Sequence, residues 1–127
     1  MEGVKICRIF PVASNDPRGM TREWKFDGGY QITSYERRGG TQFGGHYHRG
    51  DDPSKRPEHL LLVMGRVRAT FEYNGQRMQT VLEAGDALTI APMICHAMEA
   101  LEDCLFIEFR FTHFDPQYPD TYATSLQ

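Results

Sequence analysis

The sequence predicts an all-β protein, and three observations lead to this expectation. Glycine and other turn residues divide the 127-residue chain into short segments of strand length. Several of these segments alternate polar and apolar residues, whereas the spacing of an amphipathic helix is scarce. Residues 66–73 alternate without a break, and Asn74-Gly75 then supplies the two positive φ angles that a tight hairpin needs. Many short strands joined by such turns are typical of a β-sandwich or β-barrel.

The first half of the chain contains four expected strands. Residues 4–10 and 30–37 form the first two, each bounded by turn residues. Residues 42–48 follow a glycine pair and end in two histidines, and residues 58–64 contain the longest apolar run of the chain. On a regular strand, alternate residues of this run point to opposite faces, so we expect one side to face the interior and the other to need a cover.

The second half contains five expected strands, 66–73, 76–82, 86–90, 96–101 and 104–113. The first two flank the Asn74-Gly75 turn and form the best-supported hairpin. The last is the longest, and its alternate apolar residues suggest a strand that packs one face on a core. The residues expected on that face are Leu105, Ile107, Phe109 and Phe111.

Length and composition limit what the protein can be. A chain of 127 residues suits one domain, so we expect residues 1–127 to form a single unit. Hydrophobic residues make up 40% and charged residues 24%, a mixture typical of globular proteins. The net charge of -3 opposes general binding to a phosphate backbone, so no nucleic-acid partner is expected.

Three further features bear on the location of the protein. The apolar run 60–64 is far too short to span a bilayer, so we expect no membrane segment. The first five residues lack the basic-then-apolar profile of a signal peptide. The cysteines, Cys7, Cys95 and Cys104, are odd in number and lack a C-x-x-C spacing, which fits reduced thiols. These features predict a cytoplasmic protein.

The most informative stretch is Gly45-His46-Tyr47-His48. Residues i and i+2 of a strand point to the same face, so His46 and His48 can occupy two adjacent coordination positions of one metal ion. A spaced carboxylate, Glu58, and a third histidine, His96, follow downstream. Taken singly, each histidine is more simply an exposed strand residue or a hydrogen-bonded core residue. The pattern as a whole favours a metal site.

The residues around this stretch resemble the cupin superfamily. The chain has Gly40, five residues, His46-Tyr47-His48, then Glu58, six residues and Gly65, where the first cupin motif reads G-x5-H-x-H-x3-4-E-x6-G. Nine residues separate His48 from Glu58 in place of three or four, so the loop carries an insertion of about five. The inserted loop carries mixed charges and is most simply a solvated turn, with a lid over the mouth of a barrel as the alternative.

A second block resembles the second cupin motif, G-x5-P-x-G-x2-H-x3-N. Gly85 and His96 keep the expected interval, whereas Pro92 is one place late, Met93 or Ile94 replaces the glycine, and Ala100 replaces the asparagine. The resemblance covers roughly residues 40–100 and implies a double-stranded β-helix, or jelly-roll barrel. It also implies one metal ion with four ligands, namely His46, His48, Glu58 and His96.

Three neutral imidazoles and one carboxylate form a nitrogen-rich set of ligands. Such a set suits Fe(II), Mn(II), Ni(II), Cu(II) or Zn(II), and composition alone does not choose among these divalent transition metals. Two histidines and a carboxylate on one face would leave coordination positions open for substrate or water.

A shorter resemblance concerns the substrate. Residues 16–23 match D-x-R-G-x-x-x-E, a signature of cupins that act on nucleotide sugars, including the dTDP-rhamnose epimerase type and its capsular-polysaccharide relatives. In that group the arginine and the glutamate help to hold the ligand, which makes Arg18 and Glu23 candidate substrate-binding residues. A guanidinium matches a phosphate well. The stretch Asp-Pro-Arg-Gly is equally a simple turn.

Three functions remain open. The first is a metal-dependent isomerase or epimerase that acts on a sugar or nucleotide sugar in carbohydrate or polysaccharide biosynthesis. The second is a metal-dependent dioxygenase of a small organic molecule, and the third is a non-catalytic barrel that binds a small ligand. We also expect a homodimer, because Leu61 and Val63 would lie on the outer face of their strand while Leu60, Leu62 and Met64 face inward.

Overall fold

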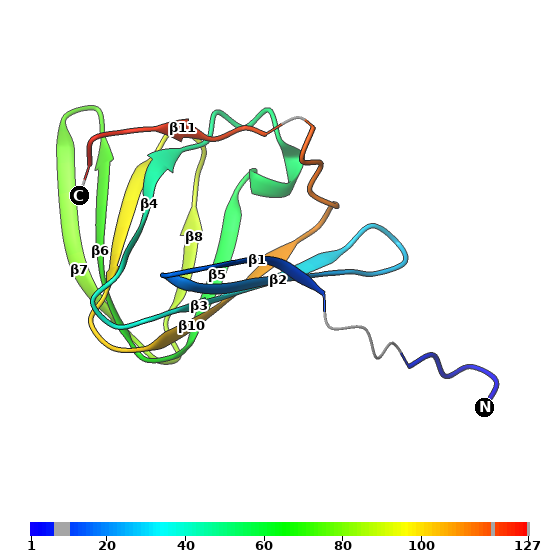
Figure 1. Ribbon diagram of the computed structural model, residues 1–127. Helices are drawn as coiled ribbons and strands as arrows, with labels where there is room; N and C mark the ends of the chain where they lie inside the picture. The colour runs from blue at the N-terminus through cyan, green and yellow to red at the C-terminus, as the bar shows by residue number, and fades with distance from the viewer. Residues whose placement is uncertain (7–10, 118, 127) are drawn as a thin grey trace.

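The protein folds as two antiparallel β-sheets that face each other, as the sequence predicts (Figure 1). The computed structural model describes residues 1–6, 11–117 and 119–126. One 3-10 turn, η1 (Pro53–Lys55), is found among these residues. The strands in chain order are β1 (Val12–Asp16), β2 (Gly19–Lys25), β3 (Gln31–Arg37), β4 (Gln42–Tyr47), β5 (Glu58–Met64), β6 (Arg66–Tyr73), β7 (Gln76–Glu83), β8 (Ala87–Ile90), β9 (Cys95–Ala100), β10 (Cys104–Arg110) and β11 (Tyr122–Ala123).

The sheet order is that of a jelly roll, because strands distant in sequence lie side by side. The six-stranded sheet runs β1-β2-β3-β10-β5-β8, and the five-stranded sheet runs β11-β4-β9-β6-β7. The short β11 pairs with β4 at the end of the barrel where η1 also lies (Figure 1). In the second sheet, the pairing of β4 with β9 places His46 directly opposite His96. The topology therefore joins the two histidine blocks that the sequence keeps 50 residues apart.

The space between the sheets is filled by apolar side chains over about half of the barrel. Phe106, Leu62 and Val67 are completely or almost completely buried there. Burying a side chain of this size stabilises a fold by about 1.5–3 kcal/mol. The remaining core members are Ala69, Leu82, Ile90, Met98, Ala100 and Cys104. This apolar half leaves the other half of the interior to polar residues.

The expected core face of the last strand is wrong. The inward residues of β10 are Cys104, Phe106, Glu108 and Arg110, whereas Phe109 is 39% exposed. Glu108 and Arg110 can be buried because they form an ion pair, with Arg110 Nη2 2.7 Å from Glu108 Oε1. The alternate apolar residues of this strand therefore lie on its outer face and not on its core face. The strand also ends at Arg110 and does not continue to residue 113.

Other strands differ from expectation at the edges of the barrel. No strand was expected at β1 and β2, which form a hairpin that pairs with β3. Residues 4–6 form no strand, and residues 7–10 lie outside the described residues. Met64 is 55% exposed and not interior, because the register of β5 against β10 shifts next to it, whereas Leu61 and Val63 lie on the outer face as expected. The remaining strands agree within a few residues at each end.

The predicted hairpin between β6 and β7 is confirmed. The two strands pair from Arg66 to Tyr73 in continuous register, and the turn residues Asn74 and Gly75 have φ angles of 49° and 75°. In the part of the chain that the structure describes, no helix has the length and apolar character needed to cross a bilayer.

Met93 adopts a conformation that glycine favours. Its φ angle is 73°, at the position where the second cupin motif has glycine, and its backbone N–H donates to the His48 carbonyl at 2.6 Å. A side chain in this region costs about 1 kcal/mol relative to glycine.

We therefore expect Met93→Gly to be more stable than Met93→Ala by about 1 kcal/mol. Both variants remove the half-exposed methionine side chain, so their difference isolates the backbone conformation. Urea denaturation of the two proteins would measure it. Equal stabilities would show that the left-handed backbone at this position is not strained.

Candidate metal centre

Three histidine side chains converge at one end of the barrel. His46 and His48 come from β4 and the residue after it, and His96 comes from β9. One nitrogen from each imidazole lies within 4.8 Å of the other two, which is a spacing that could hold a metal ion. The ring centroids of His46 and His96 are 4.7 Å apart. His46 and His48 thus point to the same side of the chain, as the His-x-His spacing predicts.

A glycine bulge positions the first histidine. The register of β4 against β9 shifts between Gly44 and His46, so Gly45 has no partner of its own. Gly44 and Gly45 have φ angles of 77° and 71°, which side chains rarely adopt. A Cβ atom at Gly44 would also lie 3.1 Å from the backbone oxygen of His96. Bulges of this kind re-aim the following side chain, here toward the interior.

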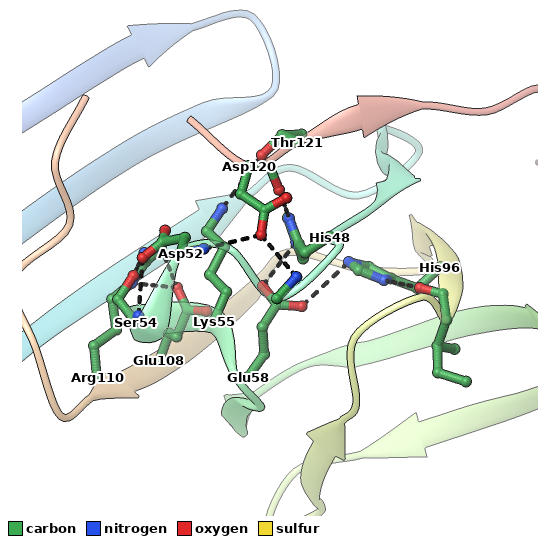
Figure 2. A network of polar contacts seen from close by, with 12 residues as sticks. His48, Asp52, Ser54, Lys55, Glu58, His96, Glu108, Arg110, Asp120 and Thr121 are labelled. Carbon is green, nitrogen blue, oxygen red and sulfur yellow. Dashed lines mark hydrogen bonds and ion pairs between the residues drawn. The ribbon is translucent and has the colours of Figure 1, made fainter. Parts of the chain in front are cut away.

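Glu58 lies between two of the histidines, despite the insertion that precedes it. Its Oε1 is 3.2 Å from His48 Nε2 and its Oε2 is 3.4 Å from His96 Nε2 (Figure 2). Two ligands of one ion with bonds of about 2.1 Å are separated by roughly 3.0 Å at a right angle and roughly 3.4 Å at the tetrahedral angle. The observed separations suit two ligands of a shared ion. His59, the next residue, points to the outer face as expected and packs against Phe111.

The hydrogen bonds of the imidazoles leave lone pairs directed into the site. His48 Nδ1 lies 2.6 Å from the backbone oxygen of Asp120, and His96 Nδ1 lies 3.1 Å from that of Ile94. A carbonyl only accepts, so each Nδ1 carries the hydrogen and each Nε2 presents a lone pair to Glu58. His48 Nε2 and Glu58 Oε2 are buried without a hydrogen-bond partner among the described residues. Lone pairs facing lone pairs are stabilised by a cation between them, so these residues fit a metal ion.

The protonation states of the site agree with this arrangement. Burial, with the neighbouring His96 and His48, lowers the pKa of His46 to about 3. Burial also lowers the pKa of His96. Burial opposes ionisation of Glu58, but the contacts with His48 and His96 outweigh it and lower its pKa to about 2. At neutral pH the neutral imidazoles of His46 and His96 therefore lie beside an anionic carboxylate.

These shifts predict that the metal-free protein loses stability in acid. Between pH 6.5 and pH 3 the unfolded chain binds a proton at residue 46 that the folded chain does not bind. The free energy of unfolding should then fall as the pH is lowered, by up to about 1.4 kcal/mol per pH unit for this proton. Glu58 adds to the fall below pH 4.5. Denaturation at several pH values would measure the slope, and His46→Gln should show a shallower one between pH 4.5 and 6.5.

The inserted loop is tied to the C-terminal segment by Asp120. The Asp120 carboxylate, which is 2% exposed, accepts from the backbone N–H groups of Arg49, Gly50 and Asp52 at 2.8–3.0 Å. These amide hydrogen bonds outweigh burial and hold the pKa of Asp120 below its usual range. Because the backbone oxygen of Asp120 also accepts from His48, the same residue orients a candidate ligand (Figure 2).

Replacing Asp120 by asparagine should therefore weaken both the fold and the site. One amide oxygen replaces two carboxylate oxygens, so we expect a loss of about 2–3 kcal/mol in stability. Loss of a group that orients a ligand typically lowers metal affinity by 10- to 100-fold, and we expect an effect of about that size. Asp115→Asn is the matched control, because Asp115 is exposed and accepts from Gln117 in its own turn. Titration of both variants with metal would measure the two affinities. An unchanged metal affinity in Asp120→Asn would contradict the role of Asp120 in orienting His48.

A cavity of about 260 Å³ opens beside the histidine cluster, within the polar half of the barrel. His46, His96 and Glu58 line one part of it, and Lys55 from the inserted loop also reaches it. Arg18 lines it too, as the D-x-R-G signature suggests, whereas Glu23 on β2 is not among its lining residues. The structure therefore brings together five of the six predicted site residues.

Several polar residues of the cavity were not predicted from the sequence. Tyr35 donates to Glu108 at 2.6 Å, and Arg110 also binds Glu108 and donates to Ser54 at 2.9 Å. Arg37 and Lys55 contribute further positive charge. One signal could have found the ion pair, since Glu108-x-Arg110 puts opposite charges on one face of a strand.

Comparisons with known proteins agree with this architecture. No protein-family model matches the sequence, and no curated protein matches it either. Among solved structures, the chain is similar to the capsular polysaccharide assembling protein CapF from Staphylococcus aureus, with a TM-score of 0.77 and 23% identity over 93% of this chain. It is also similar to the oxalate decarboxylase of Bacillus subtilis, with a TM-score of 0.69 and 16% identity over 90% of this chain. The chain has the cupin fold.

The cupin similarity concerns the fold and part of each neighbour. This chain spans 34% of the length of CapF and 30% of the length of the oxalate decarboxylase. CapF has also been solved with the inhibitor 3-isopropenyl-tropolone, and that structure matches this chain with a TM-score of 0.75 and 23% identity over 91% of the chain.

Proposed function

We propose that this cupin binds one divalent transition metal through His46, His48, His96 and Glu58, and that it is an enzyme acting on a small polar substrate. The observation that supports it most is the convergence of His48 Nε2 and His96 Nε2 on the buried Glu58 carboxylate, at 3.2 and 3.4 Å. Three neutral imidazoles and one carboxylate suit Fe(II), Mn(II), Ni(II), Cu(II) or Zn(II).

The reaction that we propose is isomerisation or epimerisation of a sugar or the sugar part of a nucleotide sugar. A bound metal would polarise a carbonyl group and lower the cost of removing a proton from the adjacent carbon. Support comes from Arg18 in the cavity wall and from the fold shared with a protein that assembles capsular polysaccharide. At about 260 Å³ the cavity is smaller than the 300–1,000 Å³ typical of drug-sized ligands, so a nucleotide would extend outside it.

The cavity contains groups that hold protons in defined states. Burial and the charge of Glu108 raise the pKa of Tyr35 well above its usual range, so the phenol stays protonated and donates to Glu108. Burial and the charge of Arg110 lower the pKa of Lys55. Tyr35 is thus held as a hydrogen-bond donor. Lys55 releases its proton more easily than Tyr35 does.

Elemental analysis and isotope exchange together test the proposal. The purified protein should contain about one transition metal ion per chain. Incubation with sugars or nucleotide sugars in D2O should exchange one carbon-bound hydrogen, which NMR detects, and removal of the metal by a chelator should abolish the exchange. Protein without stoichiometric metal would contradict the metal centre. Oxygen uptake by the iron-loaded protein without hydrogen exchange would favour the dioxygenase instead.

We also propose a homodimer. Leu61, Val63 and Phe109 are each about 40–45% exposed on the outer face of the six-stranded sheet. Burying such a face against a second copy would remove apolar surface from water. Light scattering would measure the mass, and a monomer would contradict the proposal.

A further inference from the structure

Arg37 at the end of β3 is a buried cation without a carboxylate partner. Its side chain lines the cavity and the residue is only 7% exposed. Its Nη1 donates to the backbone oxygen of Glu36 at 2.8 Å, and its Nη2 donates to Thr21 Oγ1 at 3.0 Å. Among the described residues it has no ion pair, and its buried Nε has no hydrogen-bond partner. Buried charges are normally paired, so we expect an anionic ligand to bind next to this guanidinium.

Aromatic rings hold the Arg37 guanidinium in place without neutralising it. The guanidinium carbon lies 5.4 Å from the ring centroid of Tyr35 and 5.7 Å from that of Phe43. With the two hydrogen bonds, these contacts fix the position of the charge before any ligand arrives. Arginine remains ionised in proteins even where burial lowers its pKa, as it does here. The site is therefore preorganised for an anionic group.

A second guanidinium lies at the same end of the cavity. Arg18 lines the cavity, and its backbone oxygen accepts from the N–H of Arg38, the residue after Arg37. Arg18 is paired with Asp16 at 2.9 Å, but Asp16 is not among the lining residues. The two guanidiniums and one carboxylate leave a net charge of about +1 at this end. A monoanion would neutralise it.

The two ends of the cavity differ in chemistry and are separated by apolar residues. Phe43 and His46 on β4 lie opposite Met98 and His96 of β9, which are two residues and roughly 7 Å apart along that strand. Phe43 is beside Arg37, whereas His46 belongs to the histidine cluster. Leu60, Met98 and Phe106 line the cavity as well. A ligand that fills the cavity would therefore meet a cationic end, an apolar wall and the metal centre.

We propose that Arg37, with Arg18 beside it, binds the carboxylate of a small organic acid whose other polar groups reach the histidine cluster. The proposal rests on the proposed function for the far end of the cavity, and it adds the charge and the size class of the ligand. A carboxylate suits this end better than a phosphate monoester, because one net positive charge matches a monoanion. The cavity volume of about 260 Å³ suits a molecule of monosaccharide size.

Calorimetric titration of the full chain with D-glucuronate, D-glucose and D-glucose 6-phosphate tests the proposal. The wild type should bind glucuronate at least about tenfold more tightly than glucose and more tightly than the phosphate ester. Arg37→Gln should remove the preference for glucuronate, whereas Arg37→Lys should keep part of it. Arg66→Gln is the matched control, since Arg66 pairs with Glu83 on the surface. If Arg37→Gln fails to fold, Arg18→Gln, in an exposed turn, should weaken glucuronate binding several-fold.

The outcomes separate this proposal from the metal centre. A wild type that binds glucuronate no better than glucose, or prefers glucose 6-phosphate, overturns the carboxylate site even if the protein contains metal. An unchanged preference in Arg37→Gln overturns it as well. Protein without metal that still prefers glucuronate, and loses the preference in Arg37→Gln, overturns the metal centre and supports the carboxylate site. Elemental analysis of the same samples supplies the comparison.

Discussion

Replacing His48 by alanine is expected to remove the metal from the protein. His48 is 3% exposed, and its Nδ1 hydrogen bond to Asp120 directs Nε2 at Glu58, so no other side chain can take its place without moving the loop. Loss of one of four ligands should lower metal affinity by more than about 100-fold, beyond the effect of residues that only orient ligands. Elemental analysis after dialysis should find less than about a tenth of the metal of the wild type.

His59→Ala is the matched control for this experiment. His59 lies next to Glu58 on β5, but its ring points outward and packs against Phe111. The control should retain the metal. Its thermal midpoint should show whether the loss of any histidine from this region is enough to unfold the protein. Equal metal content in His48→Ala and wild type would rule out the proposed ligand set.

Replacing Glu108 by glutamine is expected to destabilise the protein by about 3–5 kcal/mol. The Arg110 guanidinium is 3% exposed and lies 2.7 Å from Glu108. Although burial lowers the pKa of Arg110, Glu108 holds it above its usual range. Glutamine keeps the shape of the side chain but leaves the buried cation without its carboxylate. Urea denaturation should show a large fall in the midpoint.

Two comparisons make the Glu108 result specific. Glu99 and Arg68 form a half-exposed pair at 3.3 Å on the other sheet, so Glu99→Gln should cost less than about 1 kcal/mol. Replacing both members of the buried pair, as Glu108→Leu with Arg110→Met, should cost less than Glu108→Gln, because no uncompensated charge remains. A Glu108→Gln protein as stable as Glu99→Gln would mean that Arg110 finds another partner.

The two experiments test opposite sides of the polar half of the barrel. His48 belongs to the candidate metal centre next to the inserted loop, whereas Glu108 and Arg110 connect β10 to Tyr35 and to Ser54 in η1. Figure 2 shows Lys55 between the side chains of Glu58 and Glu108. The loop therefore contacts both the metal centre and the buried ion pair. Loss of either should loosen the loop that carries Lys55.

The sequence was informative wherever a short-range pattern had one structural solution. Asn74-Gly75 after an alternating segment specifies a tight hairpin, because the backbone of that turn needs two positive φ angles. The His46-x-His48 spacing puts both imidazoles on one side of the chain, as the structure shows. Many such strands and turns predict a β-sandwich or β-barrel, and the resemblance to the cupin motifs implies the jelly roll.

The buried face of a strand was predicted wrongly where one face carries apolar residues and the other carries charges that pair with each other. Phe109 in β10 and Phe111 just after it lie outside, whereas the charged residues Glu108 and Arg110 lie inside. Alternation shows that a strand has two faces but not which face is buried. Here the choice depends on an ion pair and on Tyr35, 73 residues away.

The sequence by itself determined the class of fold, through spacing within a few residues, and its resemblance to the two cupin motifs implied the set of candidate ligands. Only the tertiary structure placed His96 opposite His46 and inserted Glu58 between His48 and His96, because strand pairing brings distant segments together. It also decided that Arg37 is a buried cation at the edge of a cavity. Whether a side chain is buried, and whether it has a partner among the described residues, depends on every strand around it. No local sequence pattern predicts these two properties.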